Sequence, residues 1–231
     1  MAVVARPLAH AAAGRRFTMI AAVLVAVALA AGAEAALDVG VAPYREAAQT
    51  GQVGVVAGRV YAESATPTGP PQRLPGIVTV TLLPRSQALL TSFERFKEDS
   101  RGSSKAFVAA APAMRKAQDA YERELVQAGA PDLAPRVAVG ADGAFRIPEV
   151  PAGAWLVVVW QSAPVDVSGP KSRGRERQLY QLEGRTTGFQ AVTIWLREVT
   201  VGRGETASVD LNDRNEWFRG VIEEKQRDTG R

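Results

Sequence analysis

The segment ADGAFRIPEVPAGAWLVVVW, which ends at Trp160, constrains the fold of this chain more than any other part. Asp142-Gly143 predicts a tight hairpin turn of type I′, a turn that needs positive φ at both central residues. The alternation around Phe145 predicts a half-buried strand that is ended by Pro148 and Pro151-Ala152-Gly153. Residues 155–160 are apolar at every position, so they predict a central strand covered on both faces. This pattern is typical of a β-sandwich.

Other segments alternate between apolar and polar residues with the period of a strand. They are residues 53–61, 77–83, 136–139, 190–201 and 205–212. Loops rich in proline, glycine or charge separate several of them. The predicted module spans 52–212. A leader at 36–51 is expected to pack loosely or to form an edge. A tail at 213–231 contains Trp217, Phe218, Val221 and Ile222 and is expected to fray where it then becomes charged.

The period changes between residues 86 and 128, where apolar residues recur at helical spacing. Leu89 and Phe93 mark the first helix, Pro112 is expected to open the second at its first turn, and Gly129 is expected to stop it. We expect this helical hairpin to be an insertion that covers the outer face of the sheet, since amphipathic helices usually bury their apolar stripe against their own domain. The alternative is that a partner protein covers the stripe.

Residues 1–35 have the pattern of a cleaved signal peptide. Arg15-Arg16 precede an uncharged run rich in alanine, valine and leucine, and alanines at A-x-A spacing follow it. We therefore expect a secreted or periplasmic protein, with cleavage after Ala33 or Ala35. The alternative is an uncleaved anchor, although the run is at the lower limit for crossing a bilayer. Membrane contact is expected only in that case.

The composition excludes several kinds of active site. The chain has no cysteine, and its single histidine, His10, lies in the signal segment. The exported chain therefore cannot form a Ser-His-Asp triad, a Cys-His pair, a disulfide or a zinc site that uses His or Cys. Loss of the three arginines and one glutamate of the signal lowers the formal net charge from +4 to +2. That balance argues against a nucleic-acid partner.

Four blocks of the chain resemble the carboxypeptidase regulatory-like domain. They are VAGRVY, LPGIVTVTL, DGAFRIPEVPAGAWLVVV and VTVGRGETASVDL. The resemblance implies a Greek-key β-sandwich of the transthyretin type, related to starch-binding-like folds. It also implies a non-catalytic domain, in a family some of whose relatives bind carbohydrate. This chain departs from the family pattern in its insertion at 86–128.

One predicted strand carries the candidate binding residues. Thr193, Trp195 and Arg197 share a face, opposite Ile194 and Leu196. If that face is open, Trp195 can stack on a sugar ring beside polar neighbours. Otherwise Trp195 packs in the core under the helical insertion, as tryptophan usually does.

Two other features are interpreted as ordinary surface. The basic residues of the loop at 168–178 alternate and could hold an acidic polymer or phospholipid headgroups, but glycines and a glutamate interrupt them. Carboxylates are the residues left for catalysis, and no pair of them stands in a recognisable pocket motif. The sequence at 210–213 lacks the pattern of a calcium loop, so no metal and no cofactor are expected.

We therefore expect a non-enzymatic binding or scaffold module, mainly β, with an inserted helical hairpin. One alternative is a carbohydrate-binding module that uses Trp195. Another is a structural envelope protein that docks a partner through its helical insertion. The expected partner is accordingly a carbohydrate or an envelope protein.

Overall fold

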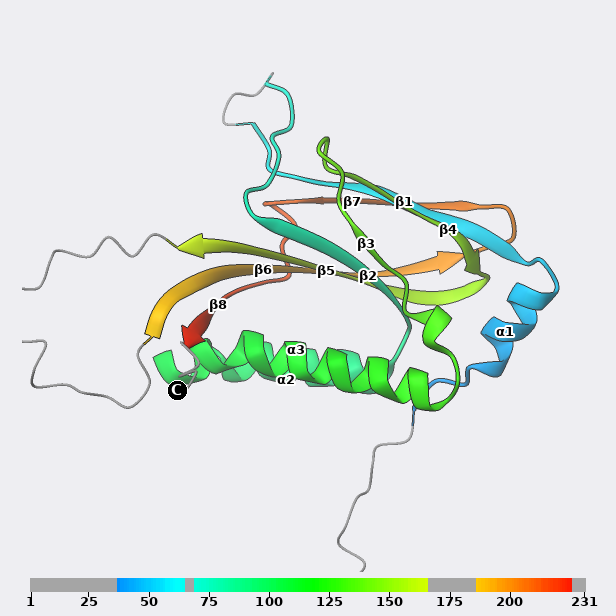
Figure 1. Ribbon diagram of the computed structural model, residues 1–231, viewed down its shortest axis with the longest axis horizontal. Coiled ribbons are helices and arrows are strands. Elements are labelled where there is room, and N and C mark those ends of the chain that lie inside the picture. Colours follow the sequence, from blue (N-terminus) through cyan, green and yellow to red (C-terminus); the bar gives the residue numbers. More distant parts are fainter. Residues whose placement is uncertain (1–36, 65–68, 166–185, 226–231) are drawn as a thin grey trace, which may run out of the picture. The chain divides into compact units, whose positions relative to one another are not determined.

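The computed structural model of this protein describes residues 37–64, 69–165 and 186–225, and Figure 1 shows how their helices and strands are arranged. One sheet has the strand order β3-β2-β5-β6-β8, and the other has the order β4-β1-β7. The strands are β1 Val53–Tyr61, β2 Ile77–Pro84, β3 Arg136–Ala138, β4 Ala144–Pro151, β5 Gly153–Val165, β6 Thr186–Val201, β7 Thr206–Asn212 and β8 Phe218–Lys225. The expected β-sandwich with a helical insertion is confirmed.

Two helices, α2 Gln87–Asp99 and α3 Ser104–Gln127, lie along one face of the five-stranded sheet (Figure 1). Each begins at a serine cap: the hydroxyl of Ser86 accepts from the amide of Leu89 at 3.0 Å, and that of Ser103 accepts from Ala106 at 3.1 Å. Helix α3 ends where Gly129 takes a positive φ of 70°, which agrees with the predicted stop.

The central strand β5 is covered on both faces, as its apolar sequence predicts. Alternate residues from Trp155 to Val159 face the three-stranded sheet, and those from Leu156 to Trp160 face the helices. No residue between Trp155 and Trp160 is more than 3% exposed. Full burial of a large apolar side chain stabilises a fold by about 1.5–3 kcal/mol. The helices are therefore part of the core of this protein.

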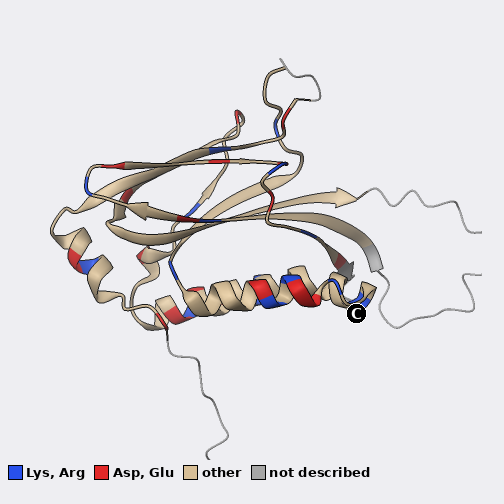
Figure 2. Cartoon of the chain, turned by 180° about the vertical axis from the view of Figure 1, so that it is seen from behind, with Lys and Arg blue, Asp and Glu red and all other residues tan. Residues whose placement is uncertain are grey.

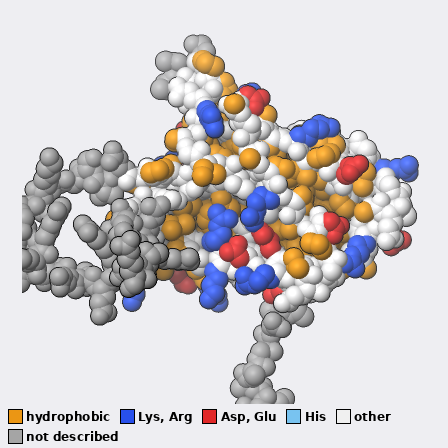
Figure 3. Space-filling model, in the orientation of Figure 1, with side chains coloured by type: hydrophobic (Ala, Val, Ile, Leu, Met, Phe, Trp, Pro, Cys, Tyr) orange, Lys and Arg blue, Asp and Glu red, His pale blue; other side chains and the backbone are white. Residues whose placement is uncertain are grey.

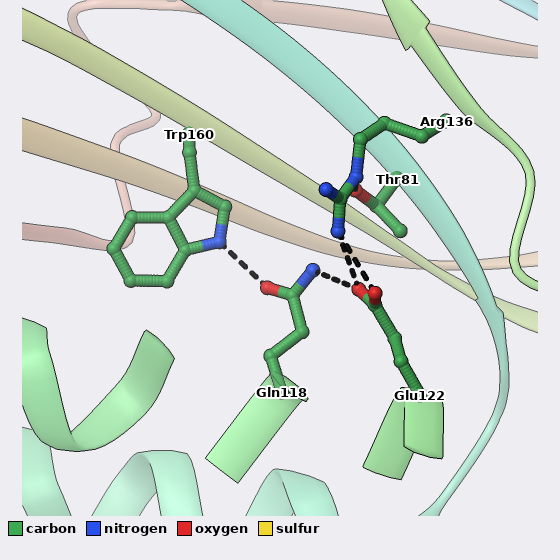
Figure 4. A network of polar contacts seen from close by, with 5 residues as sticks. All are labelled: Thr81, Gln118, Glu122, Arg136 and Trp160. Atoms are coloured by element: carbon green, nitrogen blue, oxygen red, sulfur yellow. Dashed lines mark hydrogen bonds and ion pairs between the residues drawn. The ribbon is translucent and has the colours of Figure 1, made fainter. Parts of the chain in front are cut away.

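A buried polar network fixes α3 on the sheet (Figure 4). Gln118, which is 0% exposed, accepts from the indole Nε1 of Trp160 at 2.7 Å and donates to Glu122 at 2.8 Å. Arg136 of β3 donates through Nη2 to both oxygens of Glu122, at 2.9 and 2.8 Å, and through Nε to Thr81 of β2 at 3.3 Å. The network joins α3 to three strands, so a slip of the helix along the sheet would break it.

The turn at Asp142-Gly143 differs from the predicted type I′ hairpin. Only Gly143 has positive φ, at 81°, and Asp142 does not. The amide of Gly143 donates to Gly140 at 3.0 Å, and the amide of Gly140 donates to Ala144 at 2.8 Å. This is the geometry of a three-residue loop that ends in a left-handed glycine. The flanking strands then separate, because β3 pairs with β2 while β4 pairs with β1.

Of the two breaks expected after Phe145, Pro148 does not end the strand, whereas Pro151 does. Strand β4 continues to Pro151 through a bulge, where Gly54 and Val56 of β1 oppose Val150 and Ile147. Glu149 takes a positive φ of 55° at this point. Proline is tolerated because β4 is an edge strand, and a bulge accommodates the residue that cannot pair.

Pro112 does not open the second helix either. It lies inside α3, which begins eight residues earlier at Ser104, and its ring is exposed. The helical stripe of Ala111, Met114 and Tyr121 is buried on both sides of the proline. Tertiary packing of that stripe therefore outweighs the intrinsic cost of proline in a helix.

Both ends of the module are more ordered than the sequence predicts. The leader contains helix α1, Ala42–Gln49, where buried Tyr44 donates its hydroxyl to Ala154 at 2.6 Å and packs edge-on against Trp155 at 4.9 Å. The expected fraying tail instead provides β8, which pairs with β6. The predicted signal peptide and the basic loop at 168–178 lie outside the described residues. Among the helices of the described part, none is long and apolar enough to cross a membrane.

Candidate binding site

The three binding residues expected from the sequence lie on one face of β6, but that face is turned into the sandwich. Trp195 is 0% exposed and belongs to the core between the two sheets. It is not under the helical insertion, because its neighbours Ile194 and Leu196 are the residues that face the helices. No surface of the indole is open to a sugar ring, so the proposed stacking role of Trp195 has to be corrected.

Trp195 and Arg197 instead hold the chain where it crosses from β7 to β8. The indole Nε1 of Trp195 donates to the carbonyl of Asn212 at 2.8 Å. The guanidinium of Arg197 donates through Nη2 to the carbonyl of Asn215 at 3.1 Å. Thr193 is half-buried on the same face. Trp195 and Arg197 therefore satisfy backbone carbonyls of a turn, which is a structural role.

A polar groove of about 410 Å³ lies beside α2, on the other side of the five-stranded sheet. The end of β2, the helix and β6 provide its lining: Arg85, Gln87, Leu90, Thr91, Glu94, Arg95, Glu98 and Glu198. Figure 2, in which α2 lies in front of α3, shows charged residues gathered along the second half of α2. The groove thus offers guanidinium and amide donors beside carboxylate and hydroxyl acceptors.

Part of this groove is held in place by contacts within the chain. Arg85 forms an ion pair with Glu198 and donates through Nη2 to the side chain of Gln87 at 3.2 Å. Gln87 in turn lies 3.5 Å from the hydroxyl of Thr91. These contacts fix the end of the groove next to the helix N-terminus. In its second half, Glu94 lies 3.9 Å from the Nζ of Lys97, and the charged side chains of Arg95 and Glu98 are exposed.

Trp217 is half-buried and is not among the residues that line the groove, but it contacts Glu94, which is one of them. Its Nε1 donates to Glu94 at 3.2 Å, and the ring packs against Phe93 at 6.0 Å. The Nζ of Lys97 lies 4.4 Å from the ring centroid, which is a cation–π contact. The indole is half-buried, so an aromatic edge stands next to a row of polar side chains.

Two carboxylates of the described residues are engaged within the chain. The carboxylate of Glu198 is paired with Arg85, and Asp142 accepts the amide of Ala144 at 3.0 Å within its turn. No cluster of three or more acidic or histidine side chains in the described ranges could hold a metal ion.

Sequence reasoning missed Trp217 and Glu94 because each was read as something else. Trp217 stands in the tail, ahead of the charged part that was expected to fray, and Glu94 stands on the polar side of a helix. The alternation of Phe218 and Ile222, both packed against the helices, was the signal for β8. That strand is what carries Trp217 to α2.

Comparison with known proteins gives distant structural likenesses. No protein-family model matches the chain, and no curated protein matches its sequence. A crystal structure of a candidate carbohydrate-binding protein from Pseudomonas aeruginosa is similar at 15% identity and a TM-score of 0.41, over 76% of this chain and 97% of that one. The pilus backbone of Streptococcus pneumoniae is similar at 13% identity and a TM-score of 0.22, over 69% of this chain and 40% of that one. These comparisons do not confirm membership of the carboxypeptidase regulatory-like family.

Proposed function

We propose that this protein is an exported, non-enzymatic binding module that holds a carbohydrate in the groove beside α2. The observation that carries the proposal is the lining of that groove. Arg95, Glu94, Glu98 and Thr91 present donors and acceptors along one helix, and Trp217 presents an aromatic edge at their side.

A carbohydrate fits this chemistry because each sugar hydroxyl both donates and accepts. Carboxylates accept from hydroxyl groups and guanidinium groups donate to them, and charge-assisted bonds of this kind are the stronger ones. The apolar C–H face of a sugar ring packs on an aromatic side chain.

The carbohydrate hypothesis survives in a changed form. The residue first expected to stack on a sugar, Trp195, is in the core, and the site moves to the opposite side of the five-stranded sheet. The docking of a partner through the helical insertion is less well supported, because the apolar stripes of α2 and α3 are buried and the visible outer face of α3 carries mixed charges (Figure 3).

The test is a glycan array followed by calorimetric titration of the best ligand. Thr91→Ala and Arg95→Ala remove exposed groove side chains, and each is expected to weaken binding about tenfold or more, the loss of one charge-assisted or neutral hydrogen bond. Arg203→Ala, at an exposed turn between β6 and β7, is the matched control and should leave affinity unchanged. Absence of binding to every glycan, or equal loss in the control, would overturn the proposal.

A further inference from the structure

Strand β8 is an edge strand with a long pairing edge. Within the described residues it pairs with β6 on one side only, and it runs from Phe218 to Lys225 (Figure 1). The opposite edge of the same sheet, β3, has just 3 residues. An unpaired edge carries backbone N–H and C=O groups that can pair with another strand. Of the two edges, β8 is therefore the one able to form an extended ladder.

Apolar side chains gather beside this edge. Val221 of β8 lines a groove of about 560 Å³ together with Phe189, Val165, Phe107 and Val108, and three serines complete its rim. Phe107 is 38% exposed and Val165 is 40% exposed. Large apolar side chains exposed together next to an open strand edge are typical of an interface between proteins.

We propose that β8 pairs antiparallel with β8 of a second copy of this chain, about a two-fold axis that passes midway between the two copies of Val221. The axis position follows from the pleat. Residues that face each other across an antiparallel ladder point to the same side of the sheet, and a two-fold axis perpendicular to the sheet keeps every side chain on its side. One residue of β8 must therefore face its own copy, and the axis passes midway between the two.

Charge then selects Val221 among the residues of β8. With the axis there, Arg219 of each copy faces Glu223 of the other, which places two pairs of opposite charges around an apolar centre. With the axis at Ile222, Val221 faces Glu223 and the charges are unmatched. With the axis at Gly220, Arg219 faces Val221.

The side of the sheet is also favourable. Phe218 and Ile222 face the helices, so Arg219, Val221 and Glu223 lie on the other side. There Val221 is aligned with Ala191 of β6, a small residue that leaves room for a second valine at the axis. Arg219 is exposed and already bonds Glu216 of its own chain at 2.7 Å. A guanidinium has five N–H donors, so it can bind a second carboxylate as well.

A single cysteine tests the axis directly, because the chain has none of its own. Facing residues in an antiparallel ladder have Cα atoms about 4.5–5.5 Å apart, a separation that a disulfide can span. In the chain from residue 36, Val221→Cys is expected to form a covalent dimer rapidly under mild oxidation. Ile77→Cys, at an exposed position far from β8 in the sheet order, is the matched control and should form no covalent dimer under the same oxidation.

Charge reversal gives an independent readout by sedimentation velocity. Arg219→Glu and Glu223→Arg should each weaken the dimer about tenfold, since both pairs become repulsive, and the double reversal should restore it. Arg203→Glu makes the same change of net charge as Arg219→Glu but lies away from β8, and it should leave dimerisation unchanged. A chain that stays monomeric at every concentration, equal cross-linking of both cysteine variants, or a double reversal as weak as the single ones would overturn the proposal.

Discussion

The hydrogen bond between Gln118 and Trp160 gives the sharpest prediction about how the helical insertion is held. Gln118→Ala removes the acceptor of a buried indole N–H and leaves space where a fully buried side chain stood. A buried donor without a partner costs about 1–3 kcal/mol, and the lost packing adds about 1 kcal/mol or more. We expect the free energy of unfolding to fall by about 2–4 kcal/mol. Arg136 still binds Glu122 in this variant, so the ion pair does not add to the loss.

The measurement is urea denaturation of the chain from residue 36, followed by tryptophan fluorescence and by far-ultraviolet circular dichroism. Gln127→Ala is the matched control, because it makes the same substitution in the last, exposed residue of α3. That variant should unfold within about 0.5 kcal/mol of the wild type, as surface substitutions usually do. If Gln118→Ala also unfolds within that range, the network does not fix α3, and our account of the helix-to-sheet contact is wrong.

Three further substitutions test other parts of the fold. Gly58→Ala should destabilise by about 1–3 kcal/mol or more in thermal melts, because a Cβ there would lie 1.9 Å from the carbonyl oxygen of Val209 on the paired strand; an unchanged melting temperature would refute that close approach. Trp195→Ala should lower the free energy of unfolding by about 3–5 kcal/mol, because the indole is in the core, while the folded fraction keeps its glycan affinity. A loss of affinity without a loss of stability would show that Trp195 belongs to the binding site. Pro112→Ala should raise stability by up to about 3 kcal/mol in urea denaturation, because it restores a helical N–H at an exposed position, and a decrease would show that the proline is needed.

The layers of this fold could be predicted from the sequence because burial leaves a periodic trace. The run from Trp155 to Trp160 has no polar position, and that requires a cover on both faces. The helical period between 86 and 128 supplies the cover. In the same way, Gly129 marks the end of α3 because a left-handed residue at a helix C-terminus favours glycine.

The errors arise where local signals compete with packing. The prolines at 112 and 148 each suggest a boundary. The buried stripe of α3 continues past Pro112, and a bulge in the pairing of β4 with β1 accommodates Pro148. Asp142-Gly143 suggests a hairpin, although the sequence does not say that the strands on either side belong to different sheets. Charge around Trp217 suggests a loose tail, whereas pairing with β6 orders it.

The binding site was the least predictable part, because it depends on which face of β6 is covered. Trp195 and its polar neighbours alternate as they would on an open face, and the alternation is the same when the face is closed by a second sheet. The groove beside α2 joins residues from β2, α2 and β6 that are distant in sequence. No local pattern brings them together.

Chemical-shift mapping by NMR tests the central claim most directly. On titration with the glycan selected by the array, we expect the backbone amides of residues 87–98 and the indole N–H of Trp217 to shift together and to saturate. The indole N–H of Trp195, bonded inside the sandwich, should stay in place. Shifts confined to the three-stranded sheet and its loops, with α2 and Trp217 unchanged, would contradict the account.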